Sequence, residues 1–218
     1  MTNTDQQRPV GSQPAEVSAL VERCRLGERD ALAQFYRSYR ADVARNLYRV
    51  LGPSRDDVED VVQEVFIEVF RSIGRFRGDS KVSTWLYRVC VNVALQRLRK
   101  RKRLHEVGAP GEDTPETSDD HTPQRAYEAQ ERLAAVYRVL DTLSPKKRVV
   151  FVLHEIEGRE PKEIAGIVGA PVLTVRTRLH YARKEFYAIA SRDPAFADVP
   201  MRGHGGDSDE TDGGGDED

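Results

Sequence analysis

The sequence feature that most constrains the fold is residues 105–124, HEVGAPGEDTPETSDDHTPQ, near the middle of the 218-residue chain. This stretch contains three prolines and many acids, with almost no apolar side chain to bury in a core. A segment of this composition stays a linker, because burial cannot offset the entropy lost on ordering it. On both sides of it, apolar residues recur at the three- and four-residue spacing of amphipathic helices. The sequence therefore predicts an all-α fold of two small helical domains joined by an acidic flexible linker.

The predicted domain boundaries follow these changes in composition. We expect a disordered N-terminal tail at 1–14, a first domain at 15–104, the linker at 105–123, a second domain at 124–191, and an acidic, Gly/Asp-rich disordered tail at 192–218. The acidic tail could be inert, could mimic DNA and inhibit, or could contact a regulator. We favour an inert tail, because such compositions are usually only solvated.

Charge is segregated along the chain, although its net value is only −2. Residues 204–218 carry seven acids, residues 106–120 carry six, and neither stretch contains Lys or Arg. Positive charge is therefore concentrated on the two predicted domains. This distribution is typical of proteins that bind nucleic acid, but an ordinary solvated surface is also compatible with it.

Several classes of function find no support in the sequence. Cys24 and Cys90 are isolated, which indicates reduced core cysteines rather than a metal or redox site. His154 and His180 have no partner at metal-ligand spacing. No Gly-rich phosphate loop or nucleophile elbow is present, so we expect no enzyme, no catalytic residue and no cofactor. Without a long apolar run or a signal peptide, the protein should be cytoplasmic and not inserted in a membrane.

In the first domain, the third of four predicted helices, at 55–73, combines a wide apolar surface with an acidic face. Its apolar residues cover more than one stripe, so this helix should be central to the domain. An acidic face is most often only solvated, but beside a basic helix it is also a plausible dock for a basic protein. The face consists of Asp56, Asp57, Glu59, Asp60, Glu64 and Glu68, with Gln63 among them.

Residues 76–103, FRGDSKVSTWLYRVCVNVALQRLRKRKR, combine a polar loop with a helix that ends in five consecutive basic residues. One stripe of this helix carries hydrogen-bond donors and the indole of Trp85, which suits a nucleic-acid strand. Trp85 could stack on a base or pack in the core, and the sequence does not separate these alternatives. The polar stripe consists of Thr84, Arg88, Asn92, Gln96, Arg99 and Arg103, and the opposite apolar side of Leu86, Val89, Cys90, Val93 and Ala94.

The second domain is predicted to end in a helix-turn-helix. A short helix at 161–168 is followed by Gly169 and Ala170 and by a longer cationic helix from Pro171 to about Ser191. Such a second helix can enter the major groove, where long donors reach guanine edges and phosphates. A solvated basic face on an ordinary three-helix bundle is the alternative. The outward residues are Arg176, Thr177, His180, Tyr181, Arg183 and Lys184, and the inward ones are Val175, Leu179, Ala182 and Phe186.

Four segments together resemble the sigma-70 family of RNA polymerase sigma factors, specifically its extracytoplasmic function (ECF) group. They are DDVEDVVQEVFIEVF at 56–70, FRGDSKVSTWLYRVCVNVA at 76–94, LSPKKRVVFVLHEIEG at 143–158 and KEIAGIVGAPVLTVRTRLHYAR at 162–183. The resemblance implies a transcription initiation factor that binds core RNA polymerase, recognises the −35 and −10 promoter elements and helps to melt DNA. A stand-alone helix-turn-helix regulator that binds duplex DNA without polymerase is the alternative.

The resemblance also implies roles for individual residues. The third helix would bind the clamp coiled coil of the largest polymerase subunit through Asp57, Asp60, Gln63 and Glu64. The first domain would read and melt the −10 element through Phe76, Arg77, Asp79, Ser80, Lys81, Ser83, Thr84, Trp85, Arg88, Asn92, Gln96 and Arg99. The second domain would read the −35 element through Thr174, Arg176, Thr177, His180, Tyr181, Arg183 and Lys184.

Further partners are implied in the same way. The apolar surface of residues 133–151 is similar to the groove that holds the flap tip of the second-largest polymerase subunit, and the linker would thread the active-site channel. Members of the group are commonly held inactive by an anti-sigma factor, so such a partner is expected. Leu173 stands where the family frequently has Gly, and Tyr181 where it frequently has a basic residue. These two departures leave the −35 sequence open.

Overall fold

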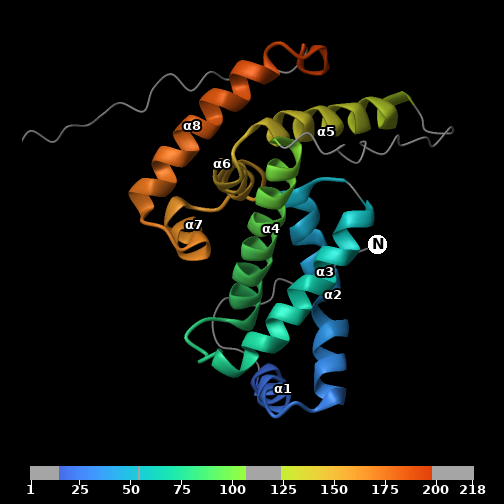
Figure 1. The fold of residues 1–218 in the computed structure, drawn as a ribbon, viewed down its shortest axis with the longest axis vertical. Helices are drawn as coiled ribbons and strands as arrows, with labels where there is room; N and C mark the ends of the chain where they lie inside the picture. The colour runs from blue at the N-terminus through green and yellow to red at the C-terminus, as the bar shows by residue number, and fades with distance from the viewer. Residues whose placement is uncertain (1–14, 54, 107–123, 198–218) are drawn as a thin grey trace, which may run out of the picture.

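The computed structural model describes residues 15–53, 55–106 and 124–197, and every regular element within these ranges is a helix (Figure 1). The predicted all-α fold is therefore confirmed. The main helices are α1 (Ala15–Arg25), α2 (Arg29–Leu51), α3 (Arg55–Ser72), α4 (Val82–Glu106), α5 (Gln124–Thr142), α6 (Pro145–Phe151), α7 (Pro161–Val168) and α8 (Val172–Ala190). Three short elements accompany them: the 3-10 helix η1 (Ile73–Arg75), the π-helical turn η2 (Val152–Ile156) and the 3-10 helix η3 (Pro194–Phe196).

Helices α1–α4 form one bundle, in which α2 packs against α1, α3 and α4. Side chains from more than one side of α3 are completely buried, among them Val61, Val62 and Val65. This burial confirms the predicted central position of the third helix. Burying a valine fully contributes about 1.5 kcal/mol or more, so this helix supplies much of the stability of the bundle.

Helices α5–α8 form a second bundle around α6 and η2, whose Val149 and Val152 are completely buried. Helix α8 lies along α6, and the rings of Phe151 and Phe186 stack with centroids 4.6 Å apart. Gly169 ends α7 in the left-handed conformation, with φ at 63°. A residue without a Cβ adopts this conformation at little cost, so the chain can turn directly into α8.

The local signals at the helix starts were predicted only in part. Ser144 and Pro145 do begin α6, but the Ser144 side chain makes no capping hydrogen bond. Helix α7 begins with a capping box that was not predicted, in which Glu160 and Glu163 each bond the other's backbone. The predicted helix start at Ser54 lies outside the described residues.

The second bundle continues beyond residue 191, where the sequence predicted the tail to begin. Phe196 is buried, and its ring meets that of Phe186 at 6.4 Å. The Asp193 carboxylate accepts a hydrogen bond from the Ala195 N–H at 3.0 Å and pairs with Arg138 at 3.3 Å. A single aromatic residue without helical periodicity therefore extends the core by one short turn.

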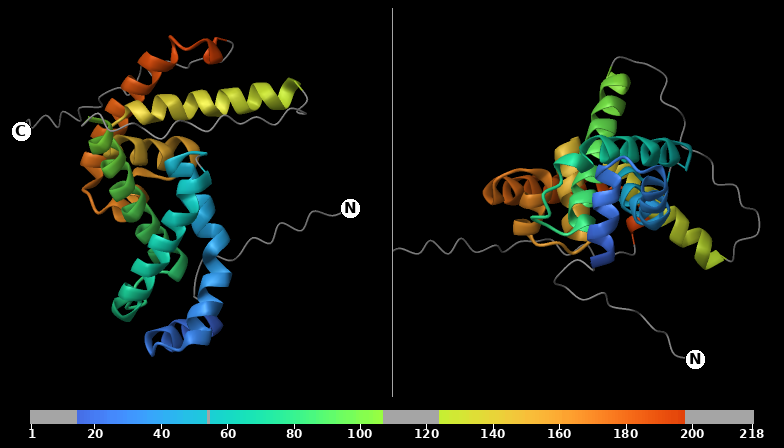
Figure 2. Two further views of the ribbon diagram at one scale, coloured as in Figure 1. Left: turned by 45° about the vertical axis from the view of Figure 1, so that its right-hand side comes forward. Right: turned by 90° about the horizontal axis from the view of Figure 1, so that it is seen from below.

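The two bundles pack directly against each other, with α4 between α2 and α3 on one side and α6 and α7 on the other (Figures 1 and 2). Arg148 of α6 is only 2% exposed, and it donates to the backbone carbonyls of Val50 and Leu51 at 2.8 Å each. These carbonyls belong to the last turn of α2 and lack partners within the helix. Arg148 also pairs with Asp141, so its buried charge is compensated.

A second polar contact joins α4 to the segment after η2. The Tyr87 hydroxyl donates to Glu157 at 2.6 Å, and the Glu157 side chain is only 4% exposed. Arg159 pairs with Glu157 at 3.0 Å and lies 4.4 Å from the centre of the Tyr87 ring. Burial and the Glu157 carboxylate raise the pKa of Tyr87 above its ordinary value, so this phenol is a neutral donor. Nothing in the sequence pattern indicated this contact.

Candidate nucleic-acid interface

The polar stripe of α4 is exposed over most of its length. Thr84, Asn92, Gln96 and Arg99 are exposed, as the helical spacing predicted. Leu95, which interrupts the stripe in the sequence, is buried in the core. The stripe therefore presents amide, hydroxyl and guanidinium groups to solvent along one side of a rigid helix.

Arg88 differs from the rest of the stripe because α7 lies against it. Its Nη2 atom is 3.7 Å from the position that a Cβ on Gly166 would occupy. Its Nε atom is buried and has no hydrogen-bond partner. A buried donor without an acceptor is costly, so among the described residues of the stripe Arg88 is the one whose position against α7 carries this cost.

The loop before α4 is held by aromatic packing. The rings of Phe76 and Trp85 lie 5.2 Å apart, and both side chains are half-buried against the core. Trp85 therefore packs in the free chain. Arg77 and Asp79 are exposed and pair at 3.3 Å. Of the other predicted loop residues, Ser80 and Lys81 are half-buried and Ser83 is exposed.

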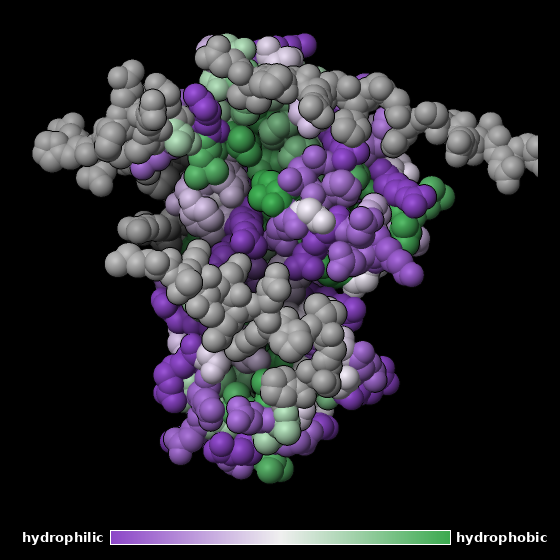
Figure 3. Space-filling model, turned by 180° about the vertical axis from the view of Figure 1, so that it is seen from behind, coloured by the Kyte–Doolittle hydropathy of each residue, from purple (hydrophilic) through white to green (hydrophobic). Residues whose placement is uncertain are grey.

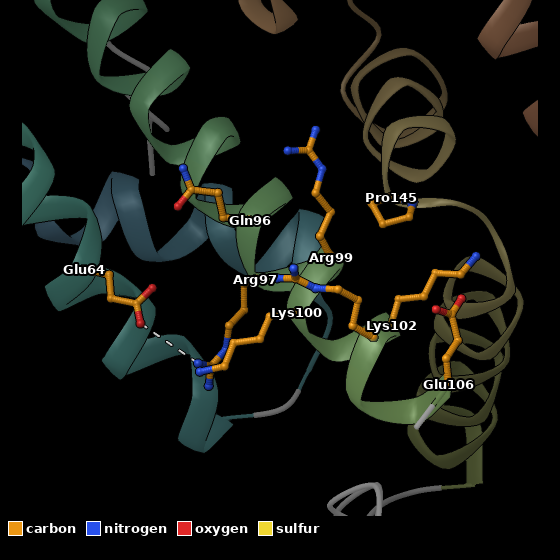
Figure 4. Close-up of a pocket in the computed structure, with 9 residues that line it drawn as sticks. Glu64, Gln96, Arg97, Arg99, Lys100, Lys102, Glu106 and Pro145 are labelled. Atoms are coloured by element: carbon orange, nitrogen blue, oxygen red, sulfur yellow. Dashed lines mark ion pairs between the residues drawn. The ribbon is translucent and has the colours of Figure 1, made fainter. Parts of the chain in front are cut away.

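A basic hollow of about 640 Å³ lies where the last turns of α4 face α3 and the start of α6 (Figure 4). Arg97 points toward α3, where its guanidinium lies 4.0 Å from Glu64, and Pro145 closes the opposite side. Cations outnumber acids here, so the hollow favours an anionic group such as phosphate. It is lined by Glu64, Gln96, Arg97, Arg99, Lys100, Lys102, Arg103, Glu106 and Pro145.

The outer face of α8 is exposed from its first turn. Arg176, Thr177, His180, Tyr181 and Lys184 are all exposed, as predicted. The rings of His180 and Tyr181 meet edge to face at 5.4 Å, and the Lys147 ammonium lies 5.8 Å from the Tyr181 ring centre. This face offers donors, acceptors and two aromatic rings within a few turns of one helix.

Two of the residues predicted to contact the −35 element are less exposed than the others. Thr174 is half-buried, and Arg183 donates to Glu155 at 2.7 Å with its side chain only partly exposed. Leu173, by contrast, was noted only as a departure from the family, yet it is among the most exposed large apolar residues of the described chain. Its place before Arg176 at helical spacing was the signal that it belongs to this face.

The acidic face of α3 is exposed at Asp60, Gln63 and Glu64, while the side chain of Asp57 lies outside the described residues. Ile67, which was not predicted as a site residue, lies on the same face and is 50% exposed. Its spacing of four residues from Gln63 and three from Glu64 could have identified it. An apolar side chain surrounded by carboxylates is a feature of protein-binding surfaces.

Hydrophobic surface is also visible in the upper part of the molecule, where α5 and α8 lie (Figure 3). Leu133 and Ile189 are exposed there, and Val136 is half-buried. This surface includes the start of the segment that the resemblance relates to flap-tip binding.

The described part of the chain contains no group of three or more His, Cys, Asp or Glu that could hold a metal ion. Cys24 and Cys90 are free and buried, as predicted, and burial raises the pKa of the Cys90 thiol to about 12. Neither thiol has the exposed, cationic surroundings of a reactive cysteine. None of the described helices is long and apolar enough to cross a membrane.

Two family models match the chain. The Sigma-70 region 2 model matches residues 35–104, and the Sigma-70, region 4 model matches residues 133–186. The first match contains the acidic face, the loop and the polar stripe, and the second contains the helix-turn-helix.

Two sigma factors are similar in sequence to about three quarters of the chain. The RNA polymerase sigma-H factor of Pseudomonas aeruginosa is 33% identical over 172 residues, which are 76% of this chain and 89% of that protein. The ECF RNA polymerase sigma-E factor of Escherichia coli (strain K12) is 36% identical over 172 residues, with the same coverage.

Two solved structures have a similar fold. The structure of CnrH in complex with the cytosolic domain of CnrY matches with a TM-score of 0.53 and 26% identity, covering 80% of this chain and 97% of that one. The sigma factor RpoE in complex with the anti-sigma factor NepR, from Bartonella quintana, matches with a TM-score of 0.52 over 74% of this chain and 97% of that one. At 18% identity, this second match supports the fold alone.

Proposed function

Because the chain belongs to the ECF group of the sigma-70 family, and is therefore a transcription initiation factor that binds RNA polymerase, we propose how its surfaces divide that work. The α1–α4 bundle acts on the −10 element, and the helix-turn-helix of the α5–α8 bundle acts on the −35 element. One observation carries this division: two separate helices of one chain, α4 and α8, each present an exposed polar and cationic face.

On the −10 side, the stripe of α4 binds the unpaired non-template strand. Thr84, Asn92 and Gln96 offer the hydrogen-bonding groups that unpaired base edges require, and the loop at 76–83 forms the pocket for a flipped base. Trp85 positions this loop through its packing on Phe76. The basic hollow neutralises strand phosphates, which offsets part of the cost of unstacking the DNA.

On the −35 side, α8 lies in the major groove. Arg176 suits a bidentate contact with guanine, and His180 and Tyr181 add donors and ring edges. Lys184 reaches a phosphate, and Arg183 does so when it leaves Glu155. Because phosphate contacts carry no sequence information, specificity depends on the first turns of α8.

The polymerase is bound by two further surfaces. The acidic face of α3 docks on the clamp coiled coil of the largest subunit through Asp60, Gln63 and Glu64, with Ile67 as an apolar anchor. The hydrophobic surface between α5 and α8 receives the flap tip of the second-largest subunit. An anti-sigma factor is a further expected partner, since the 26% identical relative CnrH was captured in complex with another protein, the cytosolic domain of CnrY.

The chain acts by binding alone, in the cytoplasm, where polymerase and promoter DNA are found. A stand-alone regulator is not favoured, because it would leave the acidic face of α3 and the loop at 76–83 without a partner. If the chain were a stand-alone regulator, it would bind duplex DNA specifically but would not bind core polymerase.

Reconstituted transcription tests this proposal. A reaction that contains core polymerase, the purified chain and a fragment library of the source genome should yield promoter-specific transcripts. These transcripts should require the chain. Glu64→Lys should abolish them together with co-elution of the chain and core polymerase, whereas Glu22→Lys on α1 is the matched control. Promoter-specific transcripts that never depend on the added chain would overturn the proposal.

A further inference from the structure

Leu173 occupies the second position of α8 and is 75% exposed. Exposed residues follow it at intervals of three, four, seven, eight and eleven, which is the spacing of a single helical stripe. They are Arg176, Thr177, His180, Tyr181 and Lys184. An apolar side chain therefore heads the stripe of polar side chains that faces the −35 duplex.

Packing in the core does not account for a leucine at position 173. The inward positions of the same turns are filled by Val175 and Leu179, both of which are buried. Single exposed leucines are common and usually need no explanation. Leu26, which follows α1 and is 79% exposed, is such a case because it lies outside the surfaces of α3, α4 and α8 described above. Leu173 differs in lying at the start of the second helix of a helix-turn-helix, the part of this motif that contacts base edges.

Thr177 extends the apolar character of this turn. Its hydroxyl donates to the Leu173 carbonyl at 3.0 Å, within the helix. The hydroxyl proton of Thr177 is thus already used, and its methyl group stands one turn from the Leu173 side chain. Together these two residues form a small apolar patch at the tip of α8.

We propose that Leu173 is a specificity-determining residue that selects thymine in the −35 duplex through contact with the 5-methyl group. This inference rests on the proposed function of α8. The thymine methyl is the one apolar feature among the base edges of the major groove, and leucine can bind it without leaving a polar group unpaired. The departure from the family at Leu173 thereby becomes a difference in promoter preference.

The test compares thymine with deoxyuridine, which differs only in lacking the 5-methyl group. A −35 duplex is first selected from a randomised pool by the full chain in complex with core polymerase, and each thymine is then replaced in turn. At one position the replacement should weaken binding about fourfold, which corresponds to roughly one buried methyl group. Leu173→Ala should bind both duplexes equally, while Leu173→Met, which keeps an apolar side chain, should still discriminate. Leu26→Ala is the matched control and should discriminate like the original chain.

Two results would overturn the inference while leaving the proposed function intact. Specific binding that no deoxyuridine replacement weakens would exclude a methyl contact. A thymine preference that Leu173→Ala retains in full would assign the contact to another residue. If the pool yields no enriched duplex at all, the proposed function of α8 fails as well, so the two failures are distinguishable.

Discussion

The outer face of α8 and the polar stripe of α4 are both cationic helical surfaces, but they differ in how accessible they are. The side chains of the α8 face are all exposed, namely Leu173, Arg176, Thr177, His180, Tyr181 and Lys184. The stripe of α4 is covered at Arg88 by α7, and its basic end is partly closed by the start of α6 (Figures 1 and 4). A duplex can therefore approach α8 in this arrangement, whereas a strand that contacts Arg88 on α4 must first displace α7.

This difference has an energetic consequence. If the binding-competent arrangement is only a fraction of the population, the apparent affinity of α4 for a strand falls by that fraction. The fraction depends on the contacts that hold the bundles together, among them those of Arg148 and of the pair Tyr87 and Glu157. Removing these contacts one at a time should therefore change the access of a strand to α4.

The largest effect is expected from Arg148→Met. The substitution removes both hydrogen bonds to the end of α2 and leaves the Val50 and Leu51 carbonyls without partners. Losing a buried, hydrogen-bonded charge should lower the free energy of unfolding by about 3 kcal/mol. Urea denaturation followed by circular dichroism measures this change. Lys146→Met, on the same helix but exposed, is the control and should stay within about 0.5 kcal/mol. Equal losses in the two variants would show that Arg148 does not hold the bundles together.

A smaller effect should distinguish the two proposed DNA-binding surfaces. Arg176→Ala should weaken binding of the selected −35 duplex by about tenfold to a hundredfold, the range for loss of a bidentate base contact. Asn92→Ala should leave duplex affinity unchanged, because α4 does not face the duplex. In complexes with core polymerase, Asn92→Ala should instead reduce the permanganate reactivity of thymines in the −10 region. The proposed roles of α4 and α8 would be refuted if Arg176→Ala and Asn92→Ala each bound the selected duplex no more tightly than a scrambled one.

The positions of the helices could be predicted from the sequence, because apolar spacing alone decides them. The third helix was predicted at 55–73 and spans Arg55–Ser72. The exposed face of α8 was predictable for the same reason. The contact between the bundles was not, since its residues are polar and resemble their exposed neighbours in the sequence. Lys146 and Arg148 belong to one basic run, yet only Arg148 is buried, and only the position of α2 explains this difference.

The smallest expected effect tests whether α4 is covered in the free chain. Tyr87→Phe removes the hydroxyl that donates to Glu157 but keeps the ring against Arg159. The loss of one hydrogen bond should cost about 1 kcal/mol. If this cost applies only to the arrangement in which the two bundles are in contact, the fraction of molecules with separated bundles should rise about fivefold. The free chain should then bind a single-stranded oligonucleotide up to about fivefold more tightly, while affinity for the −35 duplex stays the same. Tyr187→Phe, on α8 and away from the contact, is the control and should change neither affinity. If Tyr87→Phe leaves single-strand affinity unchanged, α4 is already accessible, and the difference between the two surfaces is one of chemistry rather than access.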